Sequence, residues 1–319
     1  MKNKYTIRPR EASDFEEFVS LRRKVFGDDA EFIDFFDNCF RDDYLDFLII
    51  EDQDGKDVLQ AALTQFEMGK LVVPRDKTSE IDGRSIEMSY AICTDPAARG
   101  KGYGSHITVY AREIAESSRK LSMLSPAEPS LIKFYEPLEY KKFMYAEQGT
   151  VTVDEQDDFD LSQPSFEIIS QEEYNNYREE ILMNRVHIKL SAGALSFAAG
   201  PAKGAGPDDG GAGLLLIKDG ISALPLAIAA CEAGEPGSLA AAELLTFSED
   251  GGHKELGIAV AKALATRFGV ASCHYMMPSR AGSETAVTLG MISESHEALT
   301  EIYDSEQGEC PPYMGFTFG

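Results

Sequence analysis

The fold is decided by residues 92–105, which read Ile92-Cys93-Thr94-Asp95-Pro96-Ala97-Ala98-Arg99-Gly100-Lys101-Gly102-Tyr103-Gly104-Ser105. The pattern predicts a strand that ends at Thr94, a turn at Pro96, and a glycine-rich loop that opens into a helix reaching about Lys120. Glycines let backbone N–H groups converge, and a helix N-terminus adds partial positive charge. The stretch therefore predicts a site for a pyrophosphate group.

The glycine spacing excludes two common nucleotide-binding motifs. A P-loop needs Ser or Thr after its lysine, whereas Gly102 follows Lys101. A dinucleotide fingerprint needs G-x-G-x-x-G, whereas these glycines stand at every second position. What remains is Arg-x-x-Gly-x-Gly, from Arg99 to Gly104; the alternative interpretation is a tight surface turn before an ordinary helix.

This motif and the preceding segment 90–96 resemble the acyl-CoA signature of the GNAT N-acetyltransferase superfamily. The resemblance implies acetyl-CoA as cosubstrate and backbone N–H donors at 92–94 for the oxyanion of the reaction. It also implies these cofactor-binding residues: Ile92, Cys93, Thr94, Arg99, Gly100, Lys101, Gly102, Gly104 and Ser105.

A second segment, Phe134-Tyr135-Glu136-Pro137-Leu138-Glu139-Tyr140, resembles the family's "FYEKLGF" segment. The resemblance implies that Tyr135 is the general acid that protonates the departing CoA thiolate. The alternative is a core tyrosine with its hydroxyl at a wet edge. Glu139 stands where the family usually has glycine. For the general base we select Glu87, with Glu67 behind it; either is alternatively an ordinary strand carboxylate.

The remaining pattern predicts an α+β (mixed α/β) fold with a mostly antiparallel sheet. Alternate residues of strand 86–93, from Ile86 to Ile92, are expected to face one way. A capping box from Ser13 to Glu16 is expected to open the first helix. In the first half the predicted strands are 5–8, 45–51, 58–66, 86–93, 121–124 and 140–153. Its predicted helices are 13–26, 29–40, one that starts after the glycine cluster 100–104 and runs to about 120, and 130–138.

Length and charge indicate two tandem domains. The chain has 319 residues and a formal net charge of -24, of which residues 151–319 carry -17. An acidic run at 154–160 precedes Pro164 and marks a linker. We therefore expect an acetyltransferase domain over 1–158 and a degenerate GNAT-like domain over 159–319. The Ala/Gly-rich stretch 198–213 is expected to be a flexible loop.

The second half repeats the opening of the first, with a capping box from Ser170 to Glu173. It lacks both signatures, because residues 248–255 are acidic and contain no Arg-x-x-Gly-x-Gly. A helix is expected to end near Leu289, and aligning Leu289 with Leu138 puts Ala286 at the position of Tyr135. We expect this copy not to bind CoA; shaping an acceptor pocket, covering apolar surface and dimerisation are its alternative roles.

Composition excludes several partners. The acidic balance disfavours nucleic acids and anionic membranes. Five scattered cysteines fit neither a disulfide framework nor a zinc site, and we assign no metal. The basic start lacks an apolar signal segment, and no apolar run is long enough to span a membrane, so a cytoplasmic protein is expected.

The predicted function is acetyl-CoA-dependent N-acetylation of a small-molecule or peptide amine. The acidity suits a cationic acceptor, and a homodimer is compatible with the sequence. The alternative is a non-catalytic acyl-CoA-binding or assembly protein.

Overall fold

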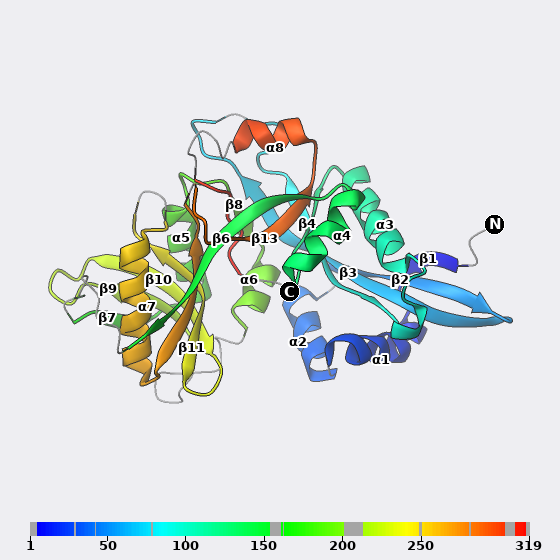
Figure 1. The fold of residues 1–319 in the computed structure, drawn as a ribbon, viewed down its shortest axis with the longest axis horizontal. Helices are drawn as coiled ribbons and strands as arrows, with labels where there is room; N and C mark the ends of the chain where they lie inside the picture. The colour runs from blue at the N-terminus through cyan, green and yellow to red at the C-terminus, as the bar shows by residue number, and fades with distance from the viewer. Residues whose placement is uncertain are drawn as a thin grey trace.

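The computed structural model describes residues 5–28, 30–41, 43–77, 79–153, 161, 163–200, 213–248, 251–280, 282–303 and 310–316. The described strands form one 13-stranded sheet that runs through both halves of the sequence (Figure 1). Twelve strands follow the order β1-β2-β3-β4-β5-β13-β6-β12-β11-β10-β9-β7, and β8 pairs with β3. Most pairs are antiparallel, so the predicted α+β class is confirmed.

The first half contributes strands β1 to β6. Their bounds are β1 Tyr5–Pro9, β2 Tyr44–Gln53, β3 Lys56–Val72, β4 Ser85–Thr94, β5 Leu121–Leu124 and β6 Lys141–Thr152. Its helices are α1 Phe15–Phe26, α2 Ala30–Phe40, α3 Tyr103–Ser117 and the short α4 Ile132–Tyr135, which is flanked by two 3-10 turns.

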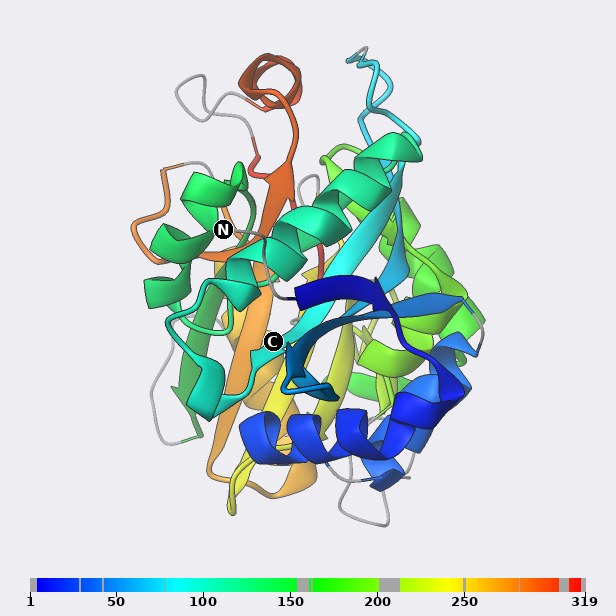
Figure 2. The ribbon, with the colours of Figure 1, turned by 90° about the vertical axis from the view of Figure 1, so that its right-hand side faces the viewer.

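Alternation along β2 shows how the helices cover the sheet. Phe47 and Ile49 pack in the cluster that includes α3, whereas Leu48 and Ile50 pack in the cluster that includes α1. Because successive strand side chains point to opposite faces, α1 and α3 lie on opposite faces of the sheet (Figure 2).

The start of α1 differs from the expected capping box. Asp14, not Ser13, is the N-cap, and its carboxylate accepts the N–H of Glu11 at 2.7 Å. A 3-10 turn at Ala12–Asp14 precedes the helix and moves its start to Phe15. The predicted box at Ser170 and Glu173 is confirmed.

The second half contributes β7 to β13 and α5 to α8. Their bounds are β7 Ser165–Ile168, α5 Gln171–Ile181, β8 His187–Leu190, α6 Ala192–Ala198, β9 Leu214–Lys218, β10 Pro225–Ala233, β11 Ser238–Thr246, α7 Lys254–Phe268, β12 Ser272–Pro278, β13 Ala286–Ser293 and α8 His296–Ile302. The unit β11-α7-β12 repeats the parallel unit β4-α3-β5 of the first half.

The two halves exchange strands. β13 lies between β5 and β6, and β6 pairs with β12 of the second half (Figure 1). The predicted helix that ends near Leu289 is therefore wrong, because that segment is strand β13. The predicted linker 154–160 lies outside the described residues, as does most of the predicted loop 198–213, whose first residue ends α6.

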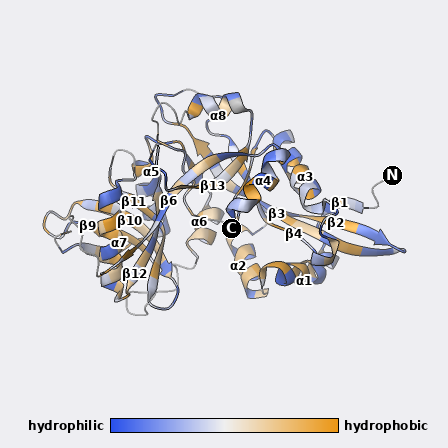
Figure 3. Cartoon of the chain, in the orientation of Figure 1, coloured by the Kyte–Doolittle hydropathy of each residue, from blue (hydrophilic) through white to orange (hydrophobic). Residues whose placement is uncertain are grey.

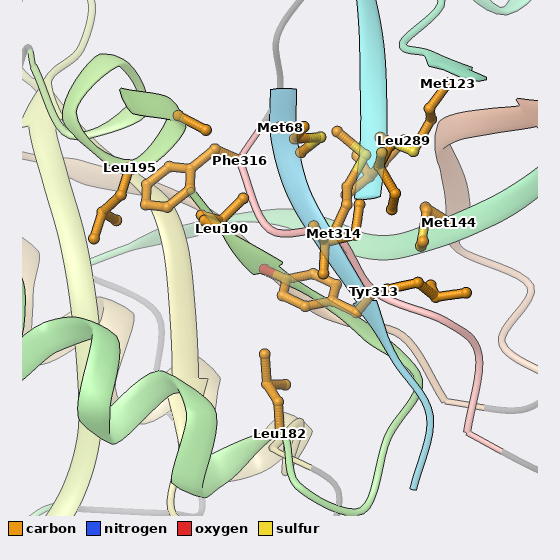
Figure 4. Close-up of a cluster of buried hydrophobic side chains, with 14 of the residues drawn as sticks. Met68, Met123, Met144, Leu182, Leu190, Leu195, Leu289, Tyr313, Met314 and Phe316 are labelled. Atoms are coloured by element: carbon orange, nitrogen blue, oxygen red, sulfur yellow. The ribbon is translucent and has the colours of Figure 1, made fainter. Parts of the chain in front are cut away.

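A large apolar cluster lies where the halves meet. Leu289 of β13 packs there with Met123 of β5, Met144 of β6 and Met314 of the C-terminal segment 310–316 (Figure 4). Apolar residues are concentrated along the strands that run through this region (Figure 3). Among the described residues, no helix is long and apolar enough to cross a membrane.

Candidate acyl-CoA cleft

The loop before α3 has the backbone that the motif predicts. Asp95 caps a 3-10 turn at Pro96–Ala98 by accepting the N–H of Ala97 at 2.8 Å. Gly100 and Gly102 follow with φ of 81° and 82°, a region that favours glycine. Gly102 is the N-cap of α3, and no described side chain caps that helix. The first-turn N–H groups are therefore available to an anion.

Two lysines near this loop are held by carboxylates. Lys101 lies 3.2 Å from Glu51 of β2, and Lys24 of α1 lies 2.8 Å from Asp95. Hydrogen bonds from Gln53 and Lys101 lower the pKa of Glu51, which is therefore ionised at neutral pH. Arg99 is exposed on the loop. The loop thus presents cations, one of them already paired with an acid.

Strand β4 continues past the end of β5. The parallel pairing runs from Ile86/Leu121 to Ser89/Leu124 and so includes every residue of β5. Beyond Ser89, the register of β4 against β3 shifts, and Ala91 has a positive φ of 50°. This is a β-bulge, which bends a strand and ends its regular pairing.

The bulge also corrects the expected facing of β4. Ile86, Met88 and Tyr90 pack in one cluster, whereas Ile92 packs with the residues near α3 and α4. The extra residue at Ala91 shifts the alternation of side chains along β4 by one position, so the Ile92 side chain lies on the face of the sheet opposite Tyr90. Residues 92–94 thus lie past the last β4–β5 pair, and on their other edge Cys93 and Thr94 still pair with Ala62 and Ala61 of β3.

Cys93 can take part in the candidate site through its backbone and not through its thiol. Its side chain is buried against α1, with Phe18 and Leu21. Burial raises the pKa of the thiol to about 12, so it stays neutral and unreactive. Any role of Cys93 toward a ligand falls to its peptide group.

Tyr135 lies beside the end of β5 and the part of β4 that continues past it. Its side chain is 7% exposed and belongs to a cluster with Leu124, Tyr140 and Met291, against which Ile92 packs. Burial raises the pKa of the phenol from 10.0 to about 12. The proton is therefore retained at every physiological pH, as a general acid requires.

Phe134, the neighbour of Tyr135, connects α4 to the start of α3. A Cβ built on Gly104 would lie 3.6 Å from the Phe134 ring and 3.6 Å from the Thr94 hydroxyl oxygen. Thr94, Gly104 and Phe134 therefore meet at one place. The structure thus brings together the end of β4, the glycine loop and the tyrosine helix.

Glu87 is not in this group. It lies five residues before Ile92 on β4, roughly 16 Å along the strand. Its carboxylate is paired with Lys120, which also lies 3.6 Å from Glu67. All three side chains line a cavity of about 720 Å³ near the C-terminal end of α3.

The residues present fit an acyl-CoA. An uncapped helix start with two positive-φ glycines suits the pyrophosphate, and the stretch of β4 beyond the end of β5 suits a chain that ends in a thioester. Arg99, Lys101 and the peptide groups of 100–105 would hold the phosphates, and the peptide groups of 92–94 would hold the acyl end.

The corresponding place in the second half is built differently. The N-cap of α7 is His253, whose Nδ1 accepts the N–H of Leu256 at 3.2 Å. A Cβ on Gly252 would lie 2.6 Å from the Pro278 carbonyl oxygen, so this loop is packed against β12. Its first turn is therefore capped by its own side chain; residues 249 and 250 lie outside the described part.

Among the described residues between β12 and β13, the second half has no counterpart of α4. Between β12 and β13, the described residues 279–280 and 282–285 form no helix. The alignment that put Ala286 at the position of Tyr135 is wrong, because Ala286 starts strand β13. No equivalent of Tyr135 lies in this described segment.

Three residues of the site around Tyr135 were not predicted as site residues from the sequence: Phe134, Tyr140 and Met291. Phe134 and Tyr140 stood inside the quoted segment, so their proximity was available in the motif. Nothing in the sequence indicated that Met291 lies near Tyr135, because its segment is predicted to be a helix of the second domain.

Comparison with known proteins adds the fold. No family model and no curated protein matches the sequence. A conserved protein of unknown function from Enterococcus faecalis V583 matches with a TM-score of 0.64 at 11% identity, over 90% of this chain and 72% of that one.

Two GCN5-related N-acetyltransferase structures are also similar. The one from Anabaena variabilis ATCC 29413 has a TM-score of 0.60 at 13% identity, over 90% of this chain and 72% of that one. The one from Kribbella flavida has 0.57 at 13% identity, over 91% and 71%. At these identities the likeness concerns architecture, and this chain is built on the fold of the GCN5-related N-acetyltransferases.

Proposed function

We propose that this protein is an acetyl-CoA-dependent N-acetyltransferase that acts on a primary amine of a small molecule or peptide. The observation that carries the proposal is the meeting of Thr94, Gly104 and Phe134 beside Tyr135. It joins an uncapped helix start to a buried tyrosine beside the end of the parallel pair β4–β5. The similar fold of the two GCN5-related N-acetyltransferases supports the same activity.

The chain's own groups would divide the work as follows. Acetyl-CoA would supply the acyl group as a thioester. The N–H groups of 92–94 would donate hydrogen bonds to the oxyanion formed when the amine attacks. Tyr135 would donate its phenolic proton to the sulfur that leaves. Holding both substrates in the cleft would supply much of the remaining rate.

Proton removal from the acceptor ammonium is assigned to Glu87. Because of its distance from Ile92 and its pair with Lys120, Glu87 would act only through water in the adjoining cavity. Glu87→Gln should lower kcat at pH 7 and regain activity as the amine deprotonates at higher pH. A uniform loss at every pH would remove Glu87 from this role.

We propose one acyl-CoA site per chain, in the first half. The capped start of α7 supports this, because His253 accepts the Leu256 N–H, one of the donors that a phosphate would use. The net charge of -24 favours cationic acceptors by long-range attraction. The protein is proposed to act in the cytoplasm and to be compatible with a homodimer.

Calorimetric titration with acetyl-CoA tests the binding step, with NAD as the control ligand. One site per chain is expected, and Arg99→Glu should weaken binding by about tenfold or more, because it reverses a charge beside the phosphates. Two sites would contradict the assignment to one half. Absence of binding would contradict the proposal that this protein is an acetyl-CoA-dependent enzyme.

Turnover separates an enzyme from a non-catalytic acyl-CoA-binding protein. Release of free CoA thiol in the presence of a panel of amines, cationic ones included, is the expected result. Tight binding without thiol release from any amine would favour the non-catalytic alternative.

A further inference from the structure

Strand β13 belongs to the second half of the sequence but borders the cleft in the first half. It pairs with β5, and Met291 lies opposite Leu124. Leu124 is also the last β5 residue that pairs with β4. The strand exchange therefore places a second-half residue at the end of β5, beside the candidate site.

Met291 lies in the cluster that holds Tyr135. Its side chain is 0% exposed, and the other buried members of the cluster are Leu124, Tyr135 and Tyr140. The Tyr140 ring meets Tyr135 edge-on, with centroids 6.3 Å apart. The Tyr140 hydroxyl is fixed by Ser122 of β5 at 2.7 Å. Tyr135 thus packs against an anchored tyrosine, in a small buried cluster to which the other half contributes Met291.

Contacts on both sides of Met291 hold β13 to the first half. Before it, the Ser125 hydroxyl donates to the Leu289 carbonyl oxygen at 2.7 Å. Just after the strand, Glu294 forms an ion pair with Arg84 at 2.8 Å. The position of Met291 is therefore set by contacts with the same half that carries Tyr135.

We infer that Met291 is a positioning residue for Tyr135, so that the second half takes part in acyl transfer without binding acyl-CoA. The inference rests on the proposed role of Tyr135. A general acid must lie within hydrogen-bond reach of the atom it protonates. A displacement of about 1 Å can cost up to about 10²-fold in rate. A cavity in place of Met291 gives the Tyr135 ring that freedom.

The first test compares two matched variants. Met291→Ala and Met277→Ala each truncate a fully buried methionine on a strand of the second half. Met277, however, packs in the cluster that includes α7, and that cluster does not contain Tyr135. Assayed below both melting temperatures, Met291→Ala should lose about tenfold or more in kcat. Its acetyl-CoA Kd should stay within about twofold of the original, because the phosphate loop is untouched.

The control variant should keep its kcat. Equal losses of kcat in both variants would show a general effect of destabilisation and overturn the inference. Met291→Leu, which conserves volume, should keep most of the activity. If the alanine variant does not fold, the smaller truncation Met291→Val is compared with Met277→Val in its place.

A double-mutant cycle asks whether Met291 acts through Tyr135. In the Tyr135→Phe background, Met291→Ala should cause little further loss of kcat, because the proton donor is already absent. Independent, multiplying losses would overturn the inference.

A spectroscopic readout separates this inference from the proposed function. In protein labelled with 3-fluorotyrosine, the Tyr135 fluorine resonance is identified by its loss in Tyr135→Phe. It should shift or broaden in Met291→Ala and stay unchanged in Met277→Ala. An unmoved resonance overturns the positioning role. Unchanged turnover in Tyr135→Phe overturns the general acid instead, whatever the resonance shows.

Discussion

The phenol of Tyr135 is buried, and burial makes it keep its proton at high pH. Burial raises its pKa to about 12, above the ordinary value of 10.0, so the protonated form persists as pH rises to about 10. We expect kcat to be flat between about pH 8 and 10, and Tyr135→Phe to lose roughly 10²-fold in kcat with the acetyl-CoA Kd unchanged. Steady-state kinetics across pH give the answer. A decline of kcat with a midpoint near pH 8.5 would assign the proton to another group.

Glu51 opposes a phosphate at the same loop. Its carboxylate pairs with Lys101 at 3.2 Å and is ionised at neutral pH. Glu51→Gln removes that negative charge and releases the lysine, so acetyl-CoA should bind about two- to fivefold more tightly at low salt. The gain should shrink at high ionic strength because salt screens exposed charges. Weaker binding in titration calorimetry would mean that Glu51 positions Lys101 for the ligand.

At the scale of elements, the cap of α5 offers a test of local stability. The Ser170 hydroxyl accepts the N–H of Glu173 at 3.2 Å, and the Glu173 carboxylate accepts the N–H of Ser170 at 2.9 Å. Ser170→Ala should lower the free energy of unfolding by about 1 kcal/mol. Ser117→Ala, in the exposed last turn of α3, is the control and should change it little. Urea denaturation that shows equal effects would contradict the capping role.

The glycine loop and the helix it opens were predictable from sequence, because glycine spacing and proline position act locally. The bulge at Ala91 was not, since alanine gives no sign that it adopts a positive φ of 50°. β13 was misassigned for a related reason. Its residues become a strand through pairing with β5 and β6, which lie more than 130 residues earlier in the chain. Long-range pairing of this kind overrides local pattern.

At the scale of the whole molecule, the sequence indicated two tandem copies, and the fold repeats the β-α-β unit as expected. The duplication could not reveal that the copies exchange strands. Further contacts join them: β8 pairs with the far end of β3, and α6 packs on α2. The segment 310–316 bonds to both sides, since the Tyr145 N–H donates to Pro312 and the Ile188 N–H to Tyr313.

These connections determine how the chain unfolds. Removing β13 from the first half exposes Leu289 and Met291 and leaves β5 and β6 without the strand that pairs with both, so neither half keeps its core when the other opens. Calorimetry should therefore show one transition, with equal calorimetric and van't Hoff enthalpies. Saturating acetyl-CoA, although bound in one half, should raise the midpoint of the whole transition. Two resolved transitions, only one of them moved by the ligand, would mean that the halves fold independently and that the exchanged strand does not couple them.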